Sequence, residues 1–380
     1  MKKEQFEIVG RGVPRKDAIE KITGGALYIN DLRFKDMLYG GVVSSPHPHA
    51  LIKAIHTEEA EKMPGVICVL THSHINGANQ VTAIIPDEPV LCKDRVLRIG
   101  DPVALVAAKT PEQLKAAMKC IRVDYEELEG VFTPERAIEH DAPILHPEKG
   151  DNILLKKTIN VGNVDEAFSN CDVIVENKYF SPRLSHMYLE PEGAIARYEN
   201  GTMTVYCCLQ HAHGCRDLIA SVMGIPMNKV RLLIQTVGGG FGGKEDFTLP
   251  CHAALLAHYS QKTVKMIRSR EESTILGTKR HPFWIRAKTG AKKDGTILAH
   301  EAHMLADAGP YCNSSPVVAT RAIMHFMGPY NIPNIRGECL MLYTNNPISG
   351  SFRGFGAPQA AICYEGQMSA IAKALGIDPL

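Results

Sequence analysis

The segment with the most chemical potential in this sequence is a glycine-rich run of eight residues. Its residues are Gly238, Gly239, Gly240, Phe241, Gly242, Gly243, Lys244 and Glu245. Glycines let backbone N–H groups approach an anionic or polar ligand with no Cβ in between. The run lies between a predicted strand, Lys229–Val237, and a predicted helix near Leu249–Tyr259. This placement predicts a loop that holds a ligand.

Two nucleotide-binding patterns match the run formally. The dinucleotide pattern GxGxxG fits from Gly238, and the P-loop pattern GxxxxGK fits through Lys244. A P-loop requires Ser or Thr after its lysine, whereas Glu245 stands there and would repel a phosphate. A dinucleotide site requires an acidic residue near the end of the next strand, but the next predicted strand, Val264–Ile267, is followed by Arg268. Nucleotide binding and a purely structural glycine turn remain open alternatives.

Two pairs of alternating histidines could bind a metal ion from a strand. They are His47 with His49, and His211 with His213. Neither pair forms a recognised metal-ligand motif with carboxylate or cysteine partners, so the pattern does not favour a metal site. His211 directly follows Gln210, so we expect His211 to lie close to the group that Gln210 contacts.

The composition narrows the class of protein. The 380 residues include 42 basic and 41 acidic ones, so no nucleic-acid partner is predicted. No stretch reaches the roughly 18 apolar residues of a membrane span, and no apolar run follows the N-terminal lysines as in a signal peptide. The 11 cysteines form no CxxC pair, which argues against iron–sulfur and zinc-ribbon sites in this chain. We expect a cytoplasmic protein in which Cys207 and Cys208 are buried.

Local patterns predict an α+β organisation in three parts. Residues 1–135 form one domain, residues 136–160 a loop-rich linker, and residues 161–380 a second region. The predicted elements, besides the two that flank the glycine-rich run, are strands at Leu38–Ser44, Val66–Leu70, Pro102–Ala108, Ile121–Tyr125, Val173–Tyr179, Met203–Leu209 and Val264–Ile267, and helices at Thr110–Cys120 and Gly214–Met223.

Several long motifs, in order, resemble the molybdenum hydroxylases, the family of xanthine dehydrogenases and aldehyde oxidases. They are GGGFGGKE, the run CCLQ that ends at Gln210, HMYLEP at 186–191, SFRGFG at 351–356, and the segments 10–32, 38–52 and 99–108. The resemblance covers essentially the whole chain. It implies an α/β hammerhead domain followed by the first molybdopterin-binding α+β domain, which together form the N-terminal half of a molybdenum-cofactor subunit.

The resemblance also implies which residues contact the cofactor, a molybdenum ion held by the dithiolene of a pterin and by no side chain. Gln210 would hydrogen-bond an oxygen ligand of the metal. The backbone at Gly239, Gly240, Phe241 and Gly242 would pack beside the metal centre, and Ser351, Phe352 and Arg353 would contact the pterin. A buried anionic group of this kind requires fixed N–H dipoles and close backbone approach.

Three further positions concern the substrate. Glu245 and Arg321 match the pair that contacts the purine in xanthine-oxidising members, and Phe355 matches an aromatic residue that flanks the flat ring. A carboxylate can orient a ring nitrogen, and an arginine can stabilise negative charge that develops on the heterocycle. Alternatively, Glu245 could cap the following helix, and Arg321 could be a solvated helix residue.

The resemblance implies an enzyme that is active only with partners. The family's second half carries the glutamate that acts as general base, and no residue of this sequence matches it. A second molybdenum-subunit half, an iron–sulfur subunit with [2Fe–2S] clusters and an FAD subunit are expected, with the pterin in its cytosine dinucleotide form. The expected substrate is a small purine-like heterocycle; nicotinate, an aldehyde and a non-catalytic scaffold role remain alternatives.

Overall fold

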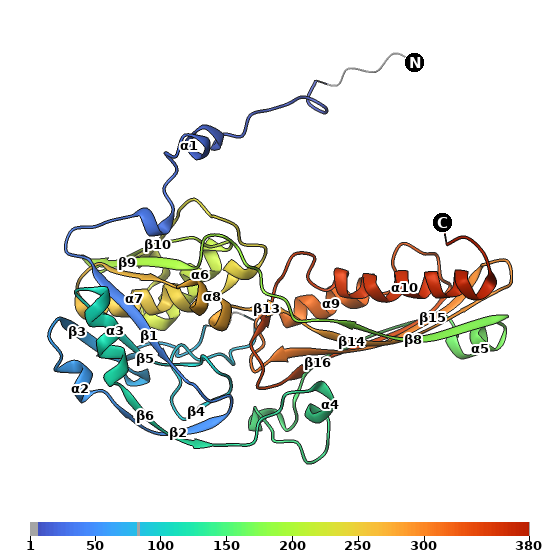
Figure 1. Cartoon of the computed structure of the whole chain (residues 1–380), viewed down its shortest axis with the longest axis horizontal. Coiled ribbons are helices and arrows are strands. Elements are labelled where there is room, and N and C mark those ends of the chain that lie inside the picture. The colour runs from blue at the N-terminus through green and yellow to red at the C-terminus, as the bar shows by residue number, and fades with distance from the viewer. Residues whose placement is uncertain (1–6, 82–83, 380) are drawn as a thin grey trace.

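The computed structural model describes residues 7–81 and 84–379, which form two lobes side by side (Figure 1). A seven-stranded sheet of order β11-β10-β9-β12-β1-β5-β3 underlies the first lobe. A five-stranded sheet of order β7-β16-β15-β14-β8 underlies the second. The predicted α+β class is therefore confirmed.

The seven-stranded sheet combines strands from distant parts of the chain. Its strands are β1 (Leu38–Ser44), β3 (Val66–Leu70), β5 (Pro102–Ala108), β9 (Gly193–Glu199), β10 (Thr202–Cys207), β11 (Val230–Ile234) and β12 (Val264–Ile267). Parallel pairing of β1 with β12 aligns Leu38 with Val264. One sheet thus joins the predicted N-terminal domain to the region that carries the glycine-rich run.

Short elements complete the first lobe. A three-stranded sheet contains β4 (Arg95–Val96), β2 (Ala50–His56) and β6 (Arg122–Glu127). The helices are α1 (Ala18–Ile22), α2 (Glu58–Glu61), α3 (Pro111–Cys120), α6 (Ala212–Met223), α7 (Thr248–Ser260) and α8 (Arg270–Leu276), with a 3-10 turn η1 (Ile29–Asp31). Thr110 caps the N-terminus of α3, because its hydroxyl accepts a hydrogen bond from the Gln113 N–H at 3.2 Å.

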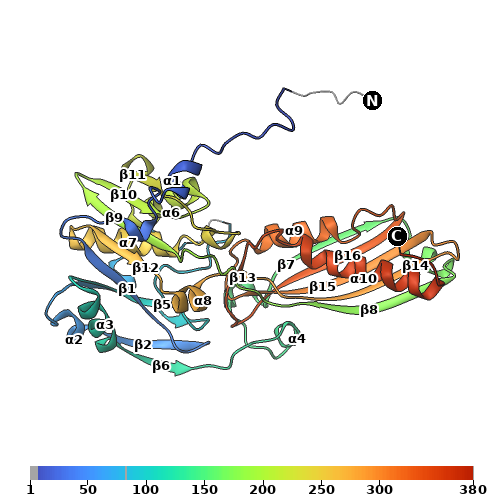
Figure 2. The same ribbon diagram turned by 45° about the horizontal axis from the view of Figure 1, so that its top comes forward.

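In the second lobe, two long helices, α9 (Ser315–His325) and α10 (Ala357–Leu375), cover one face of the sheet (Figures 1 and 2). The strands are β7 (Ile153–Val161), β8 (Val173–Ser181), β14 (Phe283–Ala291), β15 (Ile297–Gly309) and β16 (Asn334–Tyr343). Helices α4 (Pro134–Ala137) and α5 (Val164–Ser169) and the two-stranded pair β13 (Lys279–Arg280) with β17 (Ser349–Gly350) make up the rest. Among the described residues, no helix is long and apolar enough to cross a membrane.

One local prediction is wrong. The stretch predicted to be loop to residue 160 contains β7, which begins at Ile153. This strand lies at the edge of its sheet, pairs with β16, and leaves most of its side chains exposed or half-buried. An edge strand of this kind needs no apolar alternation, so its sequence reads as a loop.

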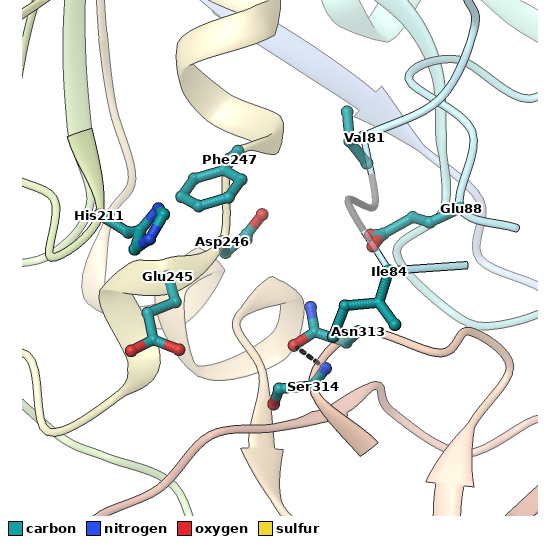
Figure 3. Close-up of a pocket in the computed structure, with 9 residues that line it drawn as sticks. All are labelled: Val81, Ile84, Glu88, His211, Glu245, Asp246, Phe247, Asn313 and Ser314. Carbon is teal, nitrogen blue, oxygen red and sulfur yellow. Dashed lines mark hydrogen bonds between the residues drawn. The ribbon is translucent and has the colours of Figure 1, made fainter. Parts of the chain in front are cut away.

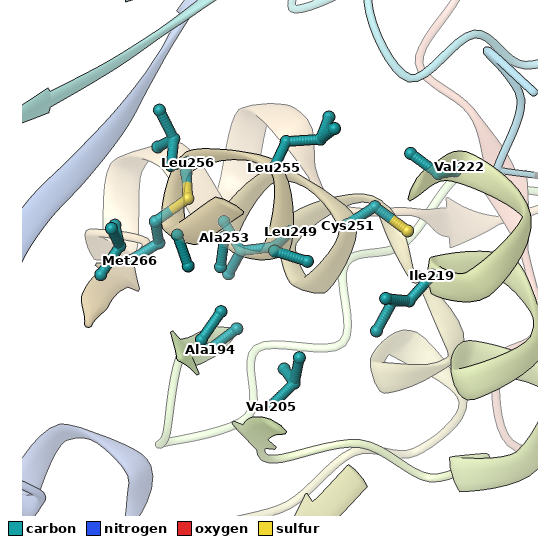
Figure 4. Packing of buried hydrophobic residues seen from close by; sticks show 14 of the residues in the cluster. Ala194, Val205, Ile219, Val222, Leu249, Cys251, Ala253, Leu255, Leu256 and Met266 are labelled. Atoms are coloured by element: carbon teal, nitrogen blue, oxygen red, sulfur yellow. The ribbon is translucent and has the colours of Figure 1, made fainter. Parts of the chain in front are cut away.

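The core of the first lobe surrounds α7, which is buried on nearly all sides (Figure 4). Residues 248–257 of this helix are buried throughout, and Leu249, Leu255 and Leu256 belong to the same apolar cluster as Val205 and Met266. A helix that is apolar all round must lie inside the protein. The loop that contains the glycine-rich run therefore ends at a helix that is fixed in the core.

Both adjacent cysteines are buried as predicted. Cys207 ends β10 and is fully buried, and Cys208 is 1% exposed. All eleven cysteines of the chain are unpaired.

Candidate functional site

The glycine-rich run is a loop whose two ends are held by one carboxylate. Glu190 Oε2 accepts a hydrogen bond from the Gly238 N–H at 2.7 Å and forms an ion pair with Lys244 Nζ at 2.6 Å. The other oxygen of Glu190 accepts from the Ile29 N–H at 3.3 Å. The Lys244 side chain is fully buried. A lysine withdrawn into this pair cannot reach a phosphate, which removes the P-loop alternative.

Gln210 also holds the glycine-rich loop by hydrogen bonds. Its Oε1 accepts hydrogen bonds from the Gly242 N–H at 2.9 Å and the Lys244 N–H at 3.3 Å. The backbone N–H of Gln210 donates to the Lys244 carbonyl at 3.0 Å. Because the loop occupies the carbonyl end of the side chain, the two hydrogens of Nε2 are left to donate to a ligand. Gln210 is exposed, so such a ligand can reach it.

The second predicted motif lies directly against this loop. The Arg353 N–H donates to the Phe241 carbonyl at 2.9 Å. Gly242 adopts a φ of +100°, and a Cβ there would lie 2.4 Å from the Ser351 carbonyl oxygen. Phe241 has a φ of +53°, which is rare for a residue with a side chain. The two loops therefore approach closely only because position 242 is glycine and Phe241 accepts strain.

Stacking fixes the position of Phe352. The His186 ring stacks on it at 4.3 Å between centroids, and the Arg280 guanidinium lies 4.1 Å from its ring centroid. His186 Nε2 also bonds the Ser351 carbonyl at 2.8 Å, and Arg280 donates to the Arg353 carbonyl at 3.0 Å. Hydrogen bonds to the carbonyls of the two neighbours of Phe352 thus fix the backbone on both sides of this residue.

A cavity of about 260 Å³ opens at the end of the glycine-rich run, next to Glu245 (Figure 3). Its lining residues are Val81, Ile84, Glu88, His211, Glu245, Asp246, Phe247, Asn313 and Ser314. Glu245 is thus one of the residues that line this cavity. The helix-cap alternative is wrong, because Asp246, and not Glu245, accepts the hydrogen bonds from the Thr248 N–H and hydroxyl, at 2.9 and 2.6 Å.

Arg321 does not line this cavity. It is exposed on α9 and lines a neighbouring hollow, and Ile84 belongs to both linings. The Arg321 guanidinium lies 4.6 Å from the ring centroid of Phe355. The structure therefore brings Arg321 together with Phe355, and the hollow that Arg321 lines adjoins, through Ile84, the cavity that Glu245 lines.

Two buried carboxyl groups of the cavity differ in charge. Burial alone would raise the pKa of Asp246, but the Arg268 guanidinium and the hydrogen bonds from Thr248 hold this pKa below its ordinary value. Arg268 Nη1 lies 3.2 Å from Asp246 and 3.2 Å from Glu192. Burial, together with the nearby Asp246 carboxylate, raises the pKa of Glu88 to about 8. Near neutral pH, Asp246 is therefore ionised and Glu88 is mostly protonated.

The histidine pairs hold local structure. His211 Nδ1 accepts from the Gly214 N–H at 3.2 Å and so caps α6, and His49 Nδ1 bonds the Glu129 carbonyl at 2.6 Å. Among residues 7–81 and 84–379, no group of three His, Cys, Asp or Glu side chains could hold a metal ion. His211 nevertheless lines the cavity and directly follows Gln210.

Sequence reasoning missed four residues that shape the site: His186, Glu190, Arg280 and Glu88. The first two belong to HMYLEP, a motif noted only for its resemblance to the family. The histidine and the glutamate of this motif could have been proposed as hydrogen-bond partners of the two loops. No local pattern distinguishes Arg280 or Glu88, because each reaches the site from a distant segment.

The donor set fits an anionic cofactor. Within the part of the chain that the structure describes, the N–H groups of Gly239, Gly240 and Phe241 donate no hydrogen bond to the protein. Arg353 is exposed at the junction of the two loops. Free N–H dipoles, the Gln210 amide and a guanidinium on one surface are the groups that a buried anionic metal–dithiolene unit requires.

Comparisons with known proteins identify the family of the chain. A model of the molybdopterin cofactor-binding domain matches residues 145–380, and a model of the aldehyde oxidase and xanthine dehydrogenase a/b hammerhead domain matches residues 23–129. The solved aldehyde oxidoreductase from Desulfovibrio gigas superposes with a TM-score of 0.92 at 34% identity, over 96% of this chain and 42% of that one.

Two curated relatives differ in how much of their length this chain spans. The nicotinate dehydrogenase large molybdopterin subunit of Eubacterium barkeri is 46% identical over 99% of this chain and 88% of its own length. A probable xanthine dehydrogenase subunit of Bacillus subtilis is 43% identical over 96% of this chain but only 49% of its own length. The chain therefore belongs to the molybdenum hydroxylase family of xanthine dehydrogenases and aldehyde oxidases, as the N-terminal part of the molybdenum subunit.

Proposed function

We propose that this chain is one half of the molybdenum subunit of an oxidoreductase that hydroxylates nitrogen heterocycles. The net reaction converts a ring C–H and one water into C–OH, two electrons and two protons. When bound, the molybdenum cofactor supplies transfer of the water-derived oxygen and accepts the two electrons. The convergence of Gln210, Gly242 and Ser351, which lie far apart in sequence, is the observation that carries this proposal.

In this proposal the chain's residues hold and orient the cofactor. Gln210 Nε2 would donate to an oxygen ligand of the metal, and the free N–H groups of Gly239, Gly240 and Phe241 would donate to the anionic dithiolene. Ser351, Phe352 and Arg353 would contact the pterin. We assign the general base to the second half of the subunit, the electron path to partner subunits with [2Fe–2S] clusters and FAD, and the pterin to its cytosine dinucleotide form. The unpaired cysteines favour a reducing, cytoplasmic compartment.

The charges of the cavity favour a purine-like substrate. Two lining residues, Glu245 and Asp246, are acidic in addition to the mostly protonated Glu88, and no lysine or arginine of the described residues belongs to the lining. An anionic substrate would be repelled there, whereas a neutral ring can donate its N–H groups to Glu245. Arg321, in the adjoining hollow, can stabilise charge that develops on the ring. Phe355 offers an aromatic face for the same ring.

A second candidate substrate is nicotinate. It is favoured by the 46% identity to a nicotinate dehydrogenase subunit of similar length. The nicotinate carboxylate would have to pair with Arg321 rather than enter the acidic cavity, since Arg321 lies outside its lining.

Turnover of a substrate panel tests the proposal. The chain, co-expressed with the second half and the electron-transfer subunits, is expected to oxidise xanthine or hypoxanthine in preference to nicotinate and benzaldehyde. Preference for nicotinate would support the second candidate. Preference for benzaldehyde would contradict heterocycle hydroxylation while leaving the family assignment in place.

We expect cofactor binding to require the complex. This chain spans 42% of the solved aldehyde oxidoreductase, and we propose that the second half of the subunit supplies the rest of the cofactor surface. Metal analysis should find little molybdenum in the chain expressed alone and close to one atom per co-expressed complex. Stoichiometric molybdenum in the isolated chain would contradict the split-subunit proposal.

The Gln210→Ala variant is expected to keep its fold and lose activity about ten- to a hundredfold, as for other supporting hydrogen bonds at metal sites. Some of the loss arises because the Gly242 and Lys244 N–H groups lose their acceptor. The Gln210→Glu variant separates the two roles, since it keeps the acceptor for the loop but removes the Nε2 donor. Full activity in Gln210→Glu would mean that Gln210 only supports the loop.

A further inference from the structure

Asn313 is a residue of the cavity wall that the second lobe contributes. It lies two residues before α9 and lines the cavity together with Glu245, which comes from the first lobe. Its side chain also lies beside Gly350, the residue before the SFRGFG motif, where a Cβ would come within 2.9 Å of Asn313 Oδ1. Asn313 therefore connects the cavity with the motif that we propose to contact the pterin.

One hydrogen bond fixes the orientation of the Asn313 amide. The Ser314 backbone N–H donates to Asn313 Oδ1 at 2.8 Å (Figure 3). A backbone N–H can only donate, so the atom that faces it is the carbonyl oxygen, and Nδ2 with its two hydrogens points away from Ser314. Figure 3 shows this nitrogen directed toward the space between Asp246 and Ile84. Within residues 7–81 and 84–379, no group accepts a hydrogen bond from Nδ2, so the cavity wall offers an unused donor.

The backbone at Asn313 is strained. Its φ of +40° lies in the left-handed region, which residues with a side chain rarely adopt. Such a conformation persists only where the surrounding structure holds it, and strain of this kind gathers at ligand sites. Here the Cys312 N–H is held by the Asp87 carboxylate at 2.9 Å, and the Ser314 N–H by the Asn313 side chain itself. Glycine would adopt this backbone more easily, so what asparagine adds at this position is its amide.

We propose that Asn313 is a specificity-determining residue whose Nδ2 donates a hydrogen bond to the exocyclic carbonyl oxygen of an oxopurine substrate. This inference rests on the proposed function and extends it. Glu245, on the first lobe, accepts from a ring N–H, and Asn313, on the second lobe, donates to the carbonyl oxygen. A ring that carries both groups satisfies both side chains. A ring without the oxygen leaves the amide donor unpaired and binds less tightly.

The test uses the co-expressed complex with two probes, hypoxanthine and purine, which differ by the exocyclic oxygen. Purine is measured as a substrate or, where it is not turned over, as a competitive inhibitor. Asn313→Gly removes the donor and suits the positive φ, whereas Asn313→Asp removes the donor but keeps an acceptor for the Ser314 N–H. Both variants are expected to raise KM for hypoxanthine about tenfold and to change the KM or inhibition constant of purine less than about twofold.

Asn200 is the matched control position, because it is an exposed asparagine with a φ of +49° between β9 and β10. Asn200→Gly and Asn200→Asp should match wild type for both probes, and molybdenum content should be unchanged in all four variants. An unchanged KM for hypoxanthine, an equal change for both probes, an effect in only one Asn313 variant, or loss of molybdenum from the Asn313 variants would overturn the role of the amide donor. A wild-type complex that oxidises no purine would instead overturn the proposed substrate, and the inference with it.

Discussion

Replacing Lys244 with methionine is expected to lower the free energy of unfolding by about 3–5 kcal/mol, because removal of one partner leaves the other buried charge without compensation. The Lys244 side chain is fully buried, and Glu190 Oε2 accepts both its ammonium group and the Gly238 N–H. Urea unfolding of the full chain, followed by circular dichroism, measures the loss. Hydrogen exchange of the Gly242 and Gly243 amides, which are hydrogen-bonded within the site, should also accelerate, since the loop loses one of its two anchors.

Two further variants test the cause of this loss. Lys262→Met removes an exposed lysine just beyond α7 and should change stability by less than about 0.5 kcal/mol. Adding Glu190→Gln to Lys244→Met should recover part of the loss, because the buried charge disappears with its partner. If Lys244→Met unfolds at the wild-type urea concentration with unchanged loop exchange, the ion pair does not hold the loop.

The Arg321→Met variant is expected to reduce xanthine turnover about a hundred- to a thousandfold, with a much smaller effect on KM. Attack on a ring carbon pushes electron density onto the heterocycle, so a facing cation stabilises the transition state more than the bound substrate. The stack on Phe355, 4.6 Å from guanidinium to ring centroid, gives Arg321 a defined position although it is exposed. Steady-state kinetics of the molybdenum-loaded complex measures the effect.

Related variants define what Arg321 contributes. Arg321→Lys keeps the charge but not the planar stack, so its turnover should fall between those of wild type and Arg321→Met. Glu245→Val should relax selectivity toward benzaldehyde, because the cavity loses its acceptor for ring N–H groups. Arg231→Met, at an exposed arginine on β11, is the control and should leave kinetics unchanged. Wild-type turnover in Arg321→Met would mean that Arg321 is only a solvated helix residue.

Local sequence was sufficient wherever one short segment carries its own signal. The strands at Leu38–Ser44, Val66–Leu70, Pro102–Ala108 and Val264–Ile267 have the predicted bounds, because apolar runs between turn residues mark buried strands. The glycine-rich loop was identifiable for a similar reason. Its close backbone approaches require glycine, as at position 242. The edge strand β7 was missed because its solvent-facing side chains carry no such pattern.

Only the tertiary structure decided what these segments do together. Lys244 looked like a phosphate-binding lysine in sequence, and its pairing with Glu190, 54 residues away, makes it an anchor of the loop. No sequence pattern distinguished Glu88. Its burial beside Asp246 raises its pKa, so that a mostly protonated carboxyl group lines the cavity. Residue type and spacing determine which local structures and donor groups are available. Burial and charge at a site depend on groups that only the folded chain brings together, so the protonation and the partner of each side chain follow from the tertiary structure.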